Sequence, residues 1–276
     1  MGAAAAERLV TVGHPVVLAN RTTERAAELA TRLGCSHADS FAQLAEQVDV
    51  LLLLVSGEDG AKEAVHGRDG ILTATDRRAT TLVVMSTVQP ELVTEISGVA
   101  VLDAPLVGRP QEFAAGDVTI LAGGSASDVT SVESLLSVLG RVVHVGPLGS
   151  GAAMKLAMNA VIFGLVAAVS ECMALATSAG AAPSVAYDVL TASALNSRFL
   201  ELRRGYFVDE GEQPVQFTME SARETLELVE GAASAVGVSL PMTRATLETL
   251  TTAVATGLGE LDVTSLPRVL TSSADR

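Results

Sequence analysis

A long apolar segment with two isolated polar side chains constrains the fold of this chain most. The segment covers residues 149–178 and opens Gly-Ser-Gly-Ala-Ala-Met-Lys-Leu-Ala-Met-Asn. This composition, after a flexible Gly-Ser-Gly turn, predicts one long helix. Lys155 and Asn159 are the only strongly polar side chains within 151–170. Their spacing of four places them on one face of the helix, one turn apart.

The environment of Lys155 leaves two interpretations open. Burying an ammonium group is costly unless the group has a partner or a chemical function. In the first interpretation Lys155 extends its charged end to solvent, and Asn159 bonds to the backbone. In the second, both side chains belong to a functional site on one face of the helix.

The segment resembles the signature of the β-hydroxyacid dehydrogenases, the group of 3-hydroxyisobutyrate dehydrogenase, glyoxylate/succinic semialdehyde reductase and 6-phosphogluconate dehydrogenase. The helix of that family opens Gly-x-Gly-x-x-x-Lys-x-x-Asn-Asn. Lys155 matches the catalytic Lys and Asn159 the second Asn, whereas Met158 replaces the first Asn. The resemblance implies an α/β fold with a Rossmann-type parallel sheet, followed by an all-helical domain. We expect an NADP-binding domain over 1–148 and a substrate and dimerisation domain over 149–276.

Composition is consistent with this class and excludes others. A length of 276 residues suggests roughly two domains, and 49% hydrophobic with 18% charged residues indicates a globular chain. A net charge of −14, no basic patch and 3% aromatic residues exclude a nucleic-acid binder. Cys35, Cys172 and the scattered histidines match no metal spacing. With no signal peptide evident and an apolar run, 156–169, short for a membrane span, we expect a cytoplasmic protein without metal or membrane partner.

The beginning of the chain resembles a dinucleotide-binding fold without its first strand. An Ala-rich helix is predicted at 2–12, a buried strand at 16–19 and a second helix at 23–33. In the family a strand runs into Gly-Leu-Gly-x-Met-Gly, whose last Gly opens the helix at the cofactor pyrophosphate. Gly2 matches that last Gly. We therefore expect the first strand and two glycines to lie upstream of residue 1, lost from this chain or excluded by a misassigned start.

Asn20-Arg21-Thr22 follows the strand at 16–19, where such a fold recognises the cofactor ribose. An acidic residue at this place would accept a hydrogen bond from the 2′-hydroxyl of NAD, whereas Arg21 suits a 2′-phosphate. Asn-Arg-Thr is also a common NADPH signature of the family, so the resemblance implies NADP(H). The alternative is an exposed Arg at the start of a helix.

Further cofactor contacts are expected where two buried strands end. The apolar runs at 48–55 and 81–85 predict parallel strands, and ligands of open α/β folds bind at the carboxyl ends of such strands. The first run ends at Val55 and Ser56, where the family has cofactor-contacting residues. The second ends at Ser86-Thr87, which matches the family loop beside the nicotinamide ribose.

Val107-Gly108-Arg109 follows a strand predicted at 99–103. In the family, Ser-Gly-Gly at this place holds the substrate carboxylate, and only Gly108 is retained here. Arg109 is either a new bidentate contact for an anion or an exposed loop residue.

The remaining periodic segments complete the prediction. Short helices are expected at 41–47 and 58–65, a strand at 117–124, a helix at 127–139, a strand at 141–145, and helices at 183–192, 216–237 and 242–257. In the last part of the chain the family has a Lys-Asp pair near the cofactor and substrate. Glu224 and Thr225 occupy those places, and Arg223 is a candidate to replace the lost cation.

Together these features predict an NADP-dependent oxidoreductase. Hydride moves between the nicotinamide and a small 3-hydroxy acid, semialdehyde or related carbonyl, and Lys155 is the general acid and base, with Asn159 beside it. We expect a homodimer or homotetramer through the helical domain. The alternatives are a catalytically inactive nucleotide-binding or scaffold protein, an imine-reducing relative, and a chain that does not fold stably.

Overall fold

The structure is a computed structural model that describes residues 1–209 and 213–272. Its contacts divide the chain into two units, Met1–Lys155 and Leu156–Arg276. The boundary between them lies inside a single long helix, so the first turns of that helix belong to the first unit.

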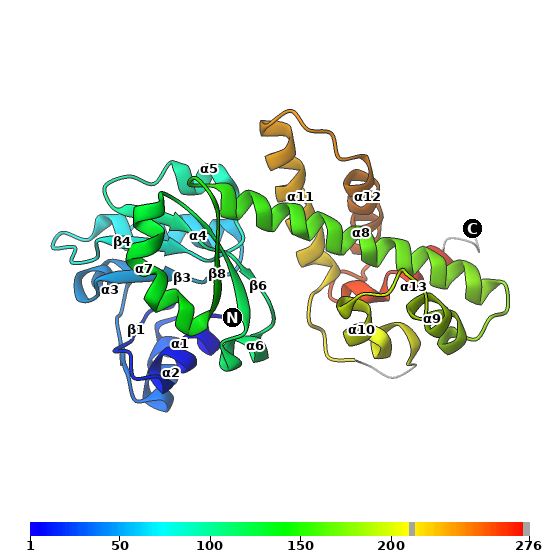
Figure 1. The fold of residues 1–276 in the computed structure, drawn as a ribbon, viewed down its shortest axis with the longest axis horizontal. Coiled ribbons are helices and arrows are strands. Elements are labelled where there is room, and N and C mark those ends of the chain that lie inside the picture. The colour runs from blue at the N-terminus through cyan, green and yellow to red at the C-terminus, as the bar shows by residue number, and fades with distance from the viewer. Residues whose placement is uncertain (210–212, 273–276) are drawn as a thin grey trace. The chain divides into compact units, whose positions relative to one another are not determined.

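Strands and helices alternate in the first unit (Figure 1). In chain order its elements are α1 (Gly2–Thr11), β1 (Val17–Leu18), α2 (Thr23–Leu33), β2 (Ser36–His37), α3 (Phe41–Gln47), β3 (Val50–Leu53), α4 (Glu58–His66), η1 (Ile71–Thr73), β4 (Thr81–Val84), α5 (Pro90–Thr94), β5 (Ala100–Asp103), β6 (Leu106–Val107), α6 (Pro110–Ala115), β7 (Val118–Gly123), α7 (Ala126–Leu139), β8 (Gly140–Gly146) and the start of α8 (Ser150–Ser178).

The main sheet of this unit has the order β3-β4-β5-β7-β6, with β8 paired to β7. β3, β4 and β5 are parallel, β7 runs antiparallel to β5 and β6, and β8 is parallel to β7. β1 and β2 form a separate parallel pair. The predicted Rossmann-type parallel sheet is confirmed for β3, β4 and β5. The part of the sheet formed by β6, β7 and β8 contains both parallel and antiparallel pairs.

Two apolar clusters cover the two faces of the main sheet. Successive side chains of a strand point to opposite faces, and β4 shows this alternation: Leu82 and Val84 pack in one cluster, whereas Val83 packs in the other. The first cluster contains side chains of α3, α4 and α5, and the second contains side chains of α1, α6 and α7. Because both faces are covered, the edge formed by the strand ends is left for ligands.

Local signals set the bounds of several helices. Gly34 ends α2 in the left-handed conformation, with φ of 68°, which glycine adopts without a steric penalty. Ser40 begins α3, where its side-chain oxygen accepts from the N–H of Gln43. The predicted bounds 23–33 and 41–47 agree with these helices.

The second unit is helical in its described residues. After α8 the chain forms α9 (Pro183–Thr191), α10 (Arg198–Val208), α11 (Met219–Ala235), α12 (Pro241–Ala255), η2 (Val263–Ser265) and α13 (Pro267–Ser272). Leu156, Phe163 and Val166 of α8 pack against α11 and α12. Farther along α8, Val169 and Met173 pack with Tyr187 of α9 and Leu200 of α10. An all-helical second part was predicted, and this is confirmed.

Some elements differ from the sequence prediction. α10 was not predicted, nor were the short helices α5 and α6 and the two-residue strand β6. α8 is long and apolar enough to cross a membrane by length and composition alone, whereas the sequence predicts that its most apolar run, 156–169, is short for a span. From Leu156 to Met173 its buried apolar side chains nevertheless belong to clusters shared with neighbouring helices.

Candidate active site

The strand ends of the main sheet bring two predicted cofactor loops together. The parallel register pairs Leu53 with Val84 and Val84 with Asp103, so β3, β4 and β5 end at one edge. The Ser86 hydroxyl accepts from the N–H of Val55 at 2.9 Å and donates to the carbonyl of Leu53 at 3.2 Å. The loops that contain Ser56 and Thr87 are therefore joined at this edge.

Gly2 lies where a helix begins against the end of β3. A Cβ added to Gly2 would be 3.3 Å from the carbonyl oxygen of Leu54, which is close contact. α1 starts at this glycine, so the first N–H groups of the helix are the positive end of its dipole. The arrangement fits a pyrophosphate, which binds at helix N-termini through such groups.

Asn20, Arg21 and Thr22 form an exposed turn after β1. The Asn20 side-chain oxygen accepts from the N–H of Thr22 at 2.9 Å, which fixes the turn. Within the described ranges the Arg21 guanidinium is exposed and has no hydrogen-bond or ion-pair partner. It is available for an anion.

Lys155 lies one turn into α8 and is half-buried. Burial lowers the pKa of its ammonium group below the ordinary value, because desolvation disfavours the charged form. No hydrogen bond or ion pair engages it in the described part of the chain. Lys62, the other lysine of the sequence, forms an ion pair of 2.7 Å with Glu58 that raises its pKa. The pKa values of the two lysines are therefore shifted in opposite directions, that of Lys155 downward by burial and that of Lys62 upward by its carboxylate partner.

Asn159 follows Lys155 by one helical turn and is 8% exposed. Its carboxamide makes no hydrogen bond to any residue that the structure describes, and its nitrogen and oxygen are not fully enclosed. Buried polar groups are normally hydrogen-bonded. The prediction that Asn159 holds Lys155 or a substrate therefore remains open, whereas the backbone bond of the first interpretation is not observed.

A residue whose role the sequence did not reveal fixes the start of α8. Asp103 at the end of β5 is fully buried, and its carboxylate accepts from the N–H groups of Gly149 and Ala152. The available signal was an Asp at the end of an otherwise apolar strand, before Ala-Pro.

The segment Val107-Gly108-Arg109 is partly committed to local structure. Val107 pairs with Thr119 in the sheet, and a Cβ on Gly108 would come within 2.8 Å of Val118. The Arg109 guanidinium lies 3.2 Å from Glu112, whose other oxygen accepts from the N–H of Arg109 at 2.7 Å. Because the Glu112 carboxylate partly neutralises Arg109, we expect this guanidinium to attract a bound anion less strongly than an unpaired guanidinium would.

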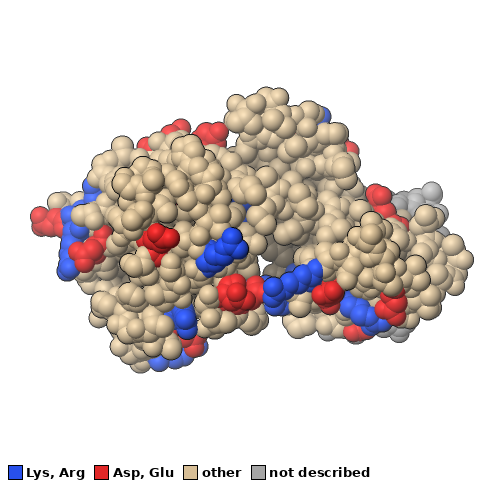
Figure 2. All heavy atoms as spheres, in the orientation of Figure 1, with Lys and Arg blue, Asp and Glu red and all other residues tan. Residues whose placement is uncertain are grey.

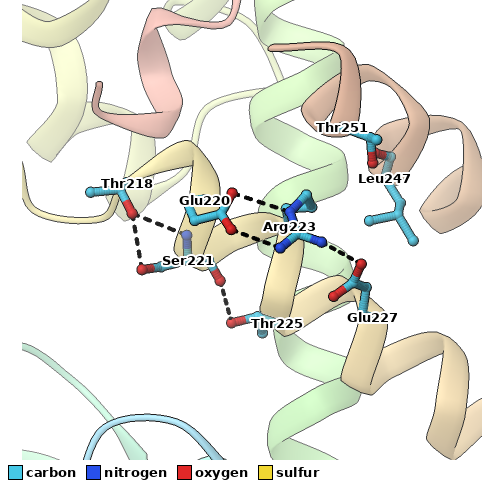
Figure 3. Close-up of polar contacts among 8 residues, drawn as sticks. All are labelled: Thr218, Glu220, Ser221, Arg223, Thr225, Glu227, Leu247 and Thr251. Atoms are coloured by element: carbon cyan, nitrogen blue, oxygen red, sulfur yellow. Dashed lines mark hydrogen bonds and ion pairs between the residues drawn. The ribbon is translucent and has the colours of Figure 1, made fainter. Parts of the chain in front are cut away.

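Arg223 on α11 is held by two carboxylates of its own helix (Figure 3). Its guanidinium bonds to Glu220 at 2.7 and 3.2 Å and also to Glu227. Hydrogen bonding to Glu220 is the main cause of its raised pKa. Glu224 is exposed, and the Thr225 hydroxyl donates to the Ser221 carbonyl. The arrangement gives no support to Arg223 as a replacement for the lost cation.

No group of His, Cys, Asp and Glu with metal-binding geometry occurs in 1–209 and 213–272. Acidic and basic side chains are scattered on the face that Figure 2 shows, and no continuous basic stretch covers it.

Comparisons with known proteins agree with this architecture. Residues 1–146 match the family described as the NAD binding domain of 6-phosphogluconate dehydrogenase. Residues 149–270 match the family described as NAD-binding of NADP-dependent 3-hydroxyisobutyrate dehydrogenase.

Individual relatives align over most of their length. L-threonate dehydrogenase of Escherichia coli K12 is 30% identical, over 98% of this chain and 91% of the relative. 2-(Hydroxymethyl)glutarate dehydrogenase of Eubacterium barkeri is 26% identical, over 86% of this chain and 80% of the relative. The crystal structure of a 3-hydroxyisobutyrate dehydrogenase from Salmonella typhimurium superposes with a TM-score of 0.84 at 27% identity, over 97% and 95% of the two chains. The chain belongs to the β-hydroxyacid dehydrogenase family and is an NAD(P)-dependent oxidoreductase acting on CH–OH groups.

Proposed function

We propose that the protein interconverts a small hydroxy acid and its carbonyl form with NADP(H), and that Lys155 transfers the proton. The main support is Lys155 itself, an amine of lowered pKa with no partner in the described ranges, at the start of a helix anchored to the cofactor-binding unit.

The proposed cofactor contacts lie along the edge of the first unit. The first N–H groups of α1 at Gly2 would hold the pyrophosphate, and Arg21 in the turn of Asn20 and Thr22 would bind a 2′-phosphate. Val55, Ser56 and Thr87 would line the loops toward the nicotinamide ribose. The bound nicotinamide supplies or receives the hydride.

Lys155 would handle the proton that accompanies this transfer. In the reductive direction the ammonium donates to the carbonyl oxygen of the substrate, and in the oxidative direction the neutral amine accepts the hydroxyl proton. The lowered pKa increases the fraction of neutral amine at a given pH, and the neutral amine is the form that the oxidative direction needs. Asn159, one turn farther on, would orient the amine or the substrate.

The names of two relatives suggest the substrate class. L-threonate and 2-(hydroxymethyl)glutarate both combine a hydroxyl with a carboxylate. In this chain Gly108 and the partly neutralised guanidinium of Arg109 would receive a carboxylate, with Val107 beside them, whereas the N–H of Arg109 already donates to Glu112. The departures at Glu224 and Thr225 favour a substrate different from those of relatives that keep the Lys-Asp pair.

A substrate panel tests this function. The purified chain is assayed by nicotinamide absorbance with L-threonate, 2-(hydroxymethyl)glutarate and 3-hydroxyisobutyrate plus NADP⁺, and with succinic semialdehyde, glyoxylate and a cyclic imine plus NADPH. We expect turnover with a hydroxy acid or its carbonyl form. Turnover of the imine alone would favour the imine-reducing alternative. Tight NADPH binding without any turnover would favour the inactive scaffold.

We also propose that the protein is a homodimer or homotetramer through its helical part. In the second unit α8 exposes Val161 (71%) and Leu175 (75%) although it is an apolar helix. Exposed apolar stretches of this kind typically mark interaction surfaces. Light scattering after size exclusion should give twice the chain mass of 28.3 kDa or a higher multiple, and Val161→Asp should shift the protein toward monomer. A monomeric wild type would contradict the proposal.

A further inference from the structure

Asp103 is a buried carboxylate whose hydrogen-bond partners come from the start of α8. One oxygen accepts from the N–H of Gly149 at 2.8 Å, and the other accepts from the N–H of Ala152 at 2.6 Å. Its side chain is 0% exposed. A buried carboxylate is costly unless its oxygens are satisfied, and charge-assisted bonds at the positive end of a helix supply that stabilisation. The residues that it joins are 46 and 49 positions away along the chain.

Two glycines allow this close approach of helix and sheet. A Cβ on Gly123 would lie 2.3 Å from the Asp103 carboxylate, and a Cβ on Gly151 would lie 2.3 Å from the carbonyl oxygen of Leu121. Neither position has room for a side chain without a shift of backbone or of the carboxylate. The first turn of α8 is therefore seated directly on β5 and β7.

The packing of the first turn of α8 on β5 and β7 fixes the backbone position of Lys155. Ala152 packs in the apolar cluster that contains side chains of α3, α4 and α5, and it lies three residues before Lys155. Three residues of a helix span only about 4.5 Å and are joined by backbone hydrogen bonds to the neighbouring turns, so this stretch is stiff. The two hydrogen bonds of Asp103 therefore fix the start of α8 both along and about the helix axis, and so fix the direction in which the Lys155 side chain extends.

We propose that Asp103 is the positioning residue of Lys155, which it holds at its working place through the first turn of α8. The inference rests on the proposed role of Lys155. Displacement of a reacting group by about 1 Å can reduce the rate roughly 100-fold. The carboxylate should therefore affect turnover beyond its effect on stability.

Asp103→Asn tests the proposal with little change of shape. The amide oxygen can accept one of the two N–H groups, whereas the amide nitrogen is a donor and faces the other. We expect kcat, counted per NADPH-binding site, to fall about 10- to 100-fold, with the Kd for NADPH unchanged. The matched control is Asp262→Asn, in the second unit. Asp262 is also buried, 5% exposed, and accepts from the N–H groups of Gln216, Phe217 and Thr264. The control should lower Tm and leave kcat per site intact.

A second readout does not depend on turnover. Lys62 and Lys155 are the two lysines of the chain, so trace acetylation followed by peptide mass spectrometry reports the reactivity of Lys155 relative to Lys62. We expect this ratio to change at least threefold in Asp103→Asn and to stay constant in Asp262→Asn. The two roles can be separated. If the acetylation ratio changed in Asp103→Asn while Lys155→Ala had the same turnover as the wild type, Asp103 would position Lys155, but Lys155 would not be catalytic.

Two results would overturn the proposal. One is a folded Asp103→Asn protein with wild-type kcat per site and a wild-type acetylation ratio, while Lys155→Ala is inactive. The other is failure to fold of both Asp103→Asn and Asp103→Ser, in which a hydroxyl still accepts one N–H, because the carboxylate would then be required for the fold itself.

Discussion

Lys155→Ala should lower kcat roughly 10²- to 10⁴-fold while the Kd for NADPH stays unchanged, because a positioned general acid or base contributes about this factor. The side chain is half-buried and has no ion-pair partner in the described ranges, so its removal leaves no unpaired carboxylate behind. The expected loss is therefore chemical and not structural. Steady-state kinetics on the best substrate of the panel, with NADPH binding followed by fluorescence, measures both quantities.

The pH dependence of the reduction rate should also differ between the wild type and Lys155→Ala. Reduction needs the protonated amine, so the wild-type rate should fall as pH rises through the pKa of Lys155. Burial lowers that pKa, and the fall should begin at a lower pH than an exposed lysine would produce. This limb should be absent from Lys155→Ala. Lys62→Ala is the control, since Lys62 is exposed and paired with Glu58. Equal kcat values for wild type and Lys155→Ala would remove Lys155 from the mechanism.

Arg21→Glu should shift the cofactor preference toward NADH. A hydrogen bond to a charged group contributes about 1.5–3 kcal/mol, so the ratio of kcat/KM for NADPH over NADH should fall about 10- to 100-fold. The introduced carboxylate repels a 2′-phosphate and can accept from the 2′-hydroxyl of NADH. The exposure of Arg21 makes a large loss of stability unexpected. Cofactor titrations at saturating substrate measure the ratio.

Arg25→Glu is the matched control for this change. Arg25 lies in the first turn of α2, is exposed, and carries the same charge four residues farther along. If both variants changed the ratio equally, the effect would come from net charge and not from a specific phosphate contact. An unchanged ratio in Arg21→Glu would contradict the NADP assignment.

The elements that the sequence predicted well carry local signals at their ends. α2 and α3 end or begin at Gly34 and Ser40, and both residues determine the backbone within one turn. α10 was missed because Gly205 interrupts its pattern and one of its most buried side chains is charged. Arg203 lies 3.6 Å from Asp262 and against the ring of Tyr206. Such a contact cannot be inferred from periodicity.

The candidate site was predictable where one helix or one loop contains it. Lys155 and Asn159 are four apart, which places them on one face of the helix, but the spacing left two interpretations open and only the resemblance to the family signature assigned them a role. The role of Asp103 depends on a contact with α8 across nearly fifty residues, which a single sequence does not show. The neutralisation of Arg109 and Arg223 by nearby carboxylates was predictable in part. Glu112 lies three residues after Arg109, and Glu220 and Glu227 lie three and four residues from Arg223 on α11.

The titration of the two lysine side chains is the most direct test of the proposed chemistry. Trace acetylation of the folded protein over a range of pH, with each lysine peptide quantified by mass spectrometry, gives the pKa of Lys155 and Lys62 in one sample. Burial should place the midpoint of Lys155 below the ordinary lysine value, whereas Glu58 should place that of Lys62 above it. A midpoint for Lys155 equal to or above that of Lys62 would contradict the account.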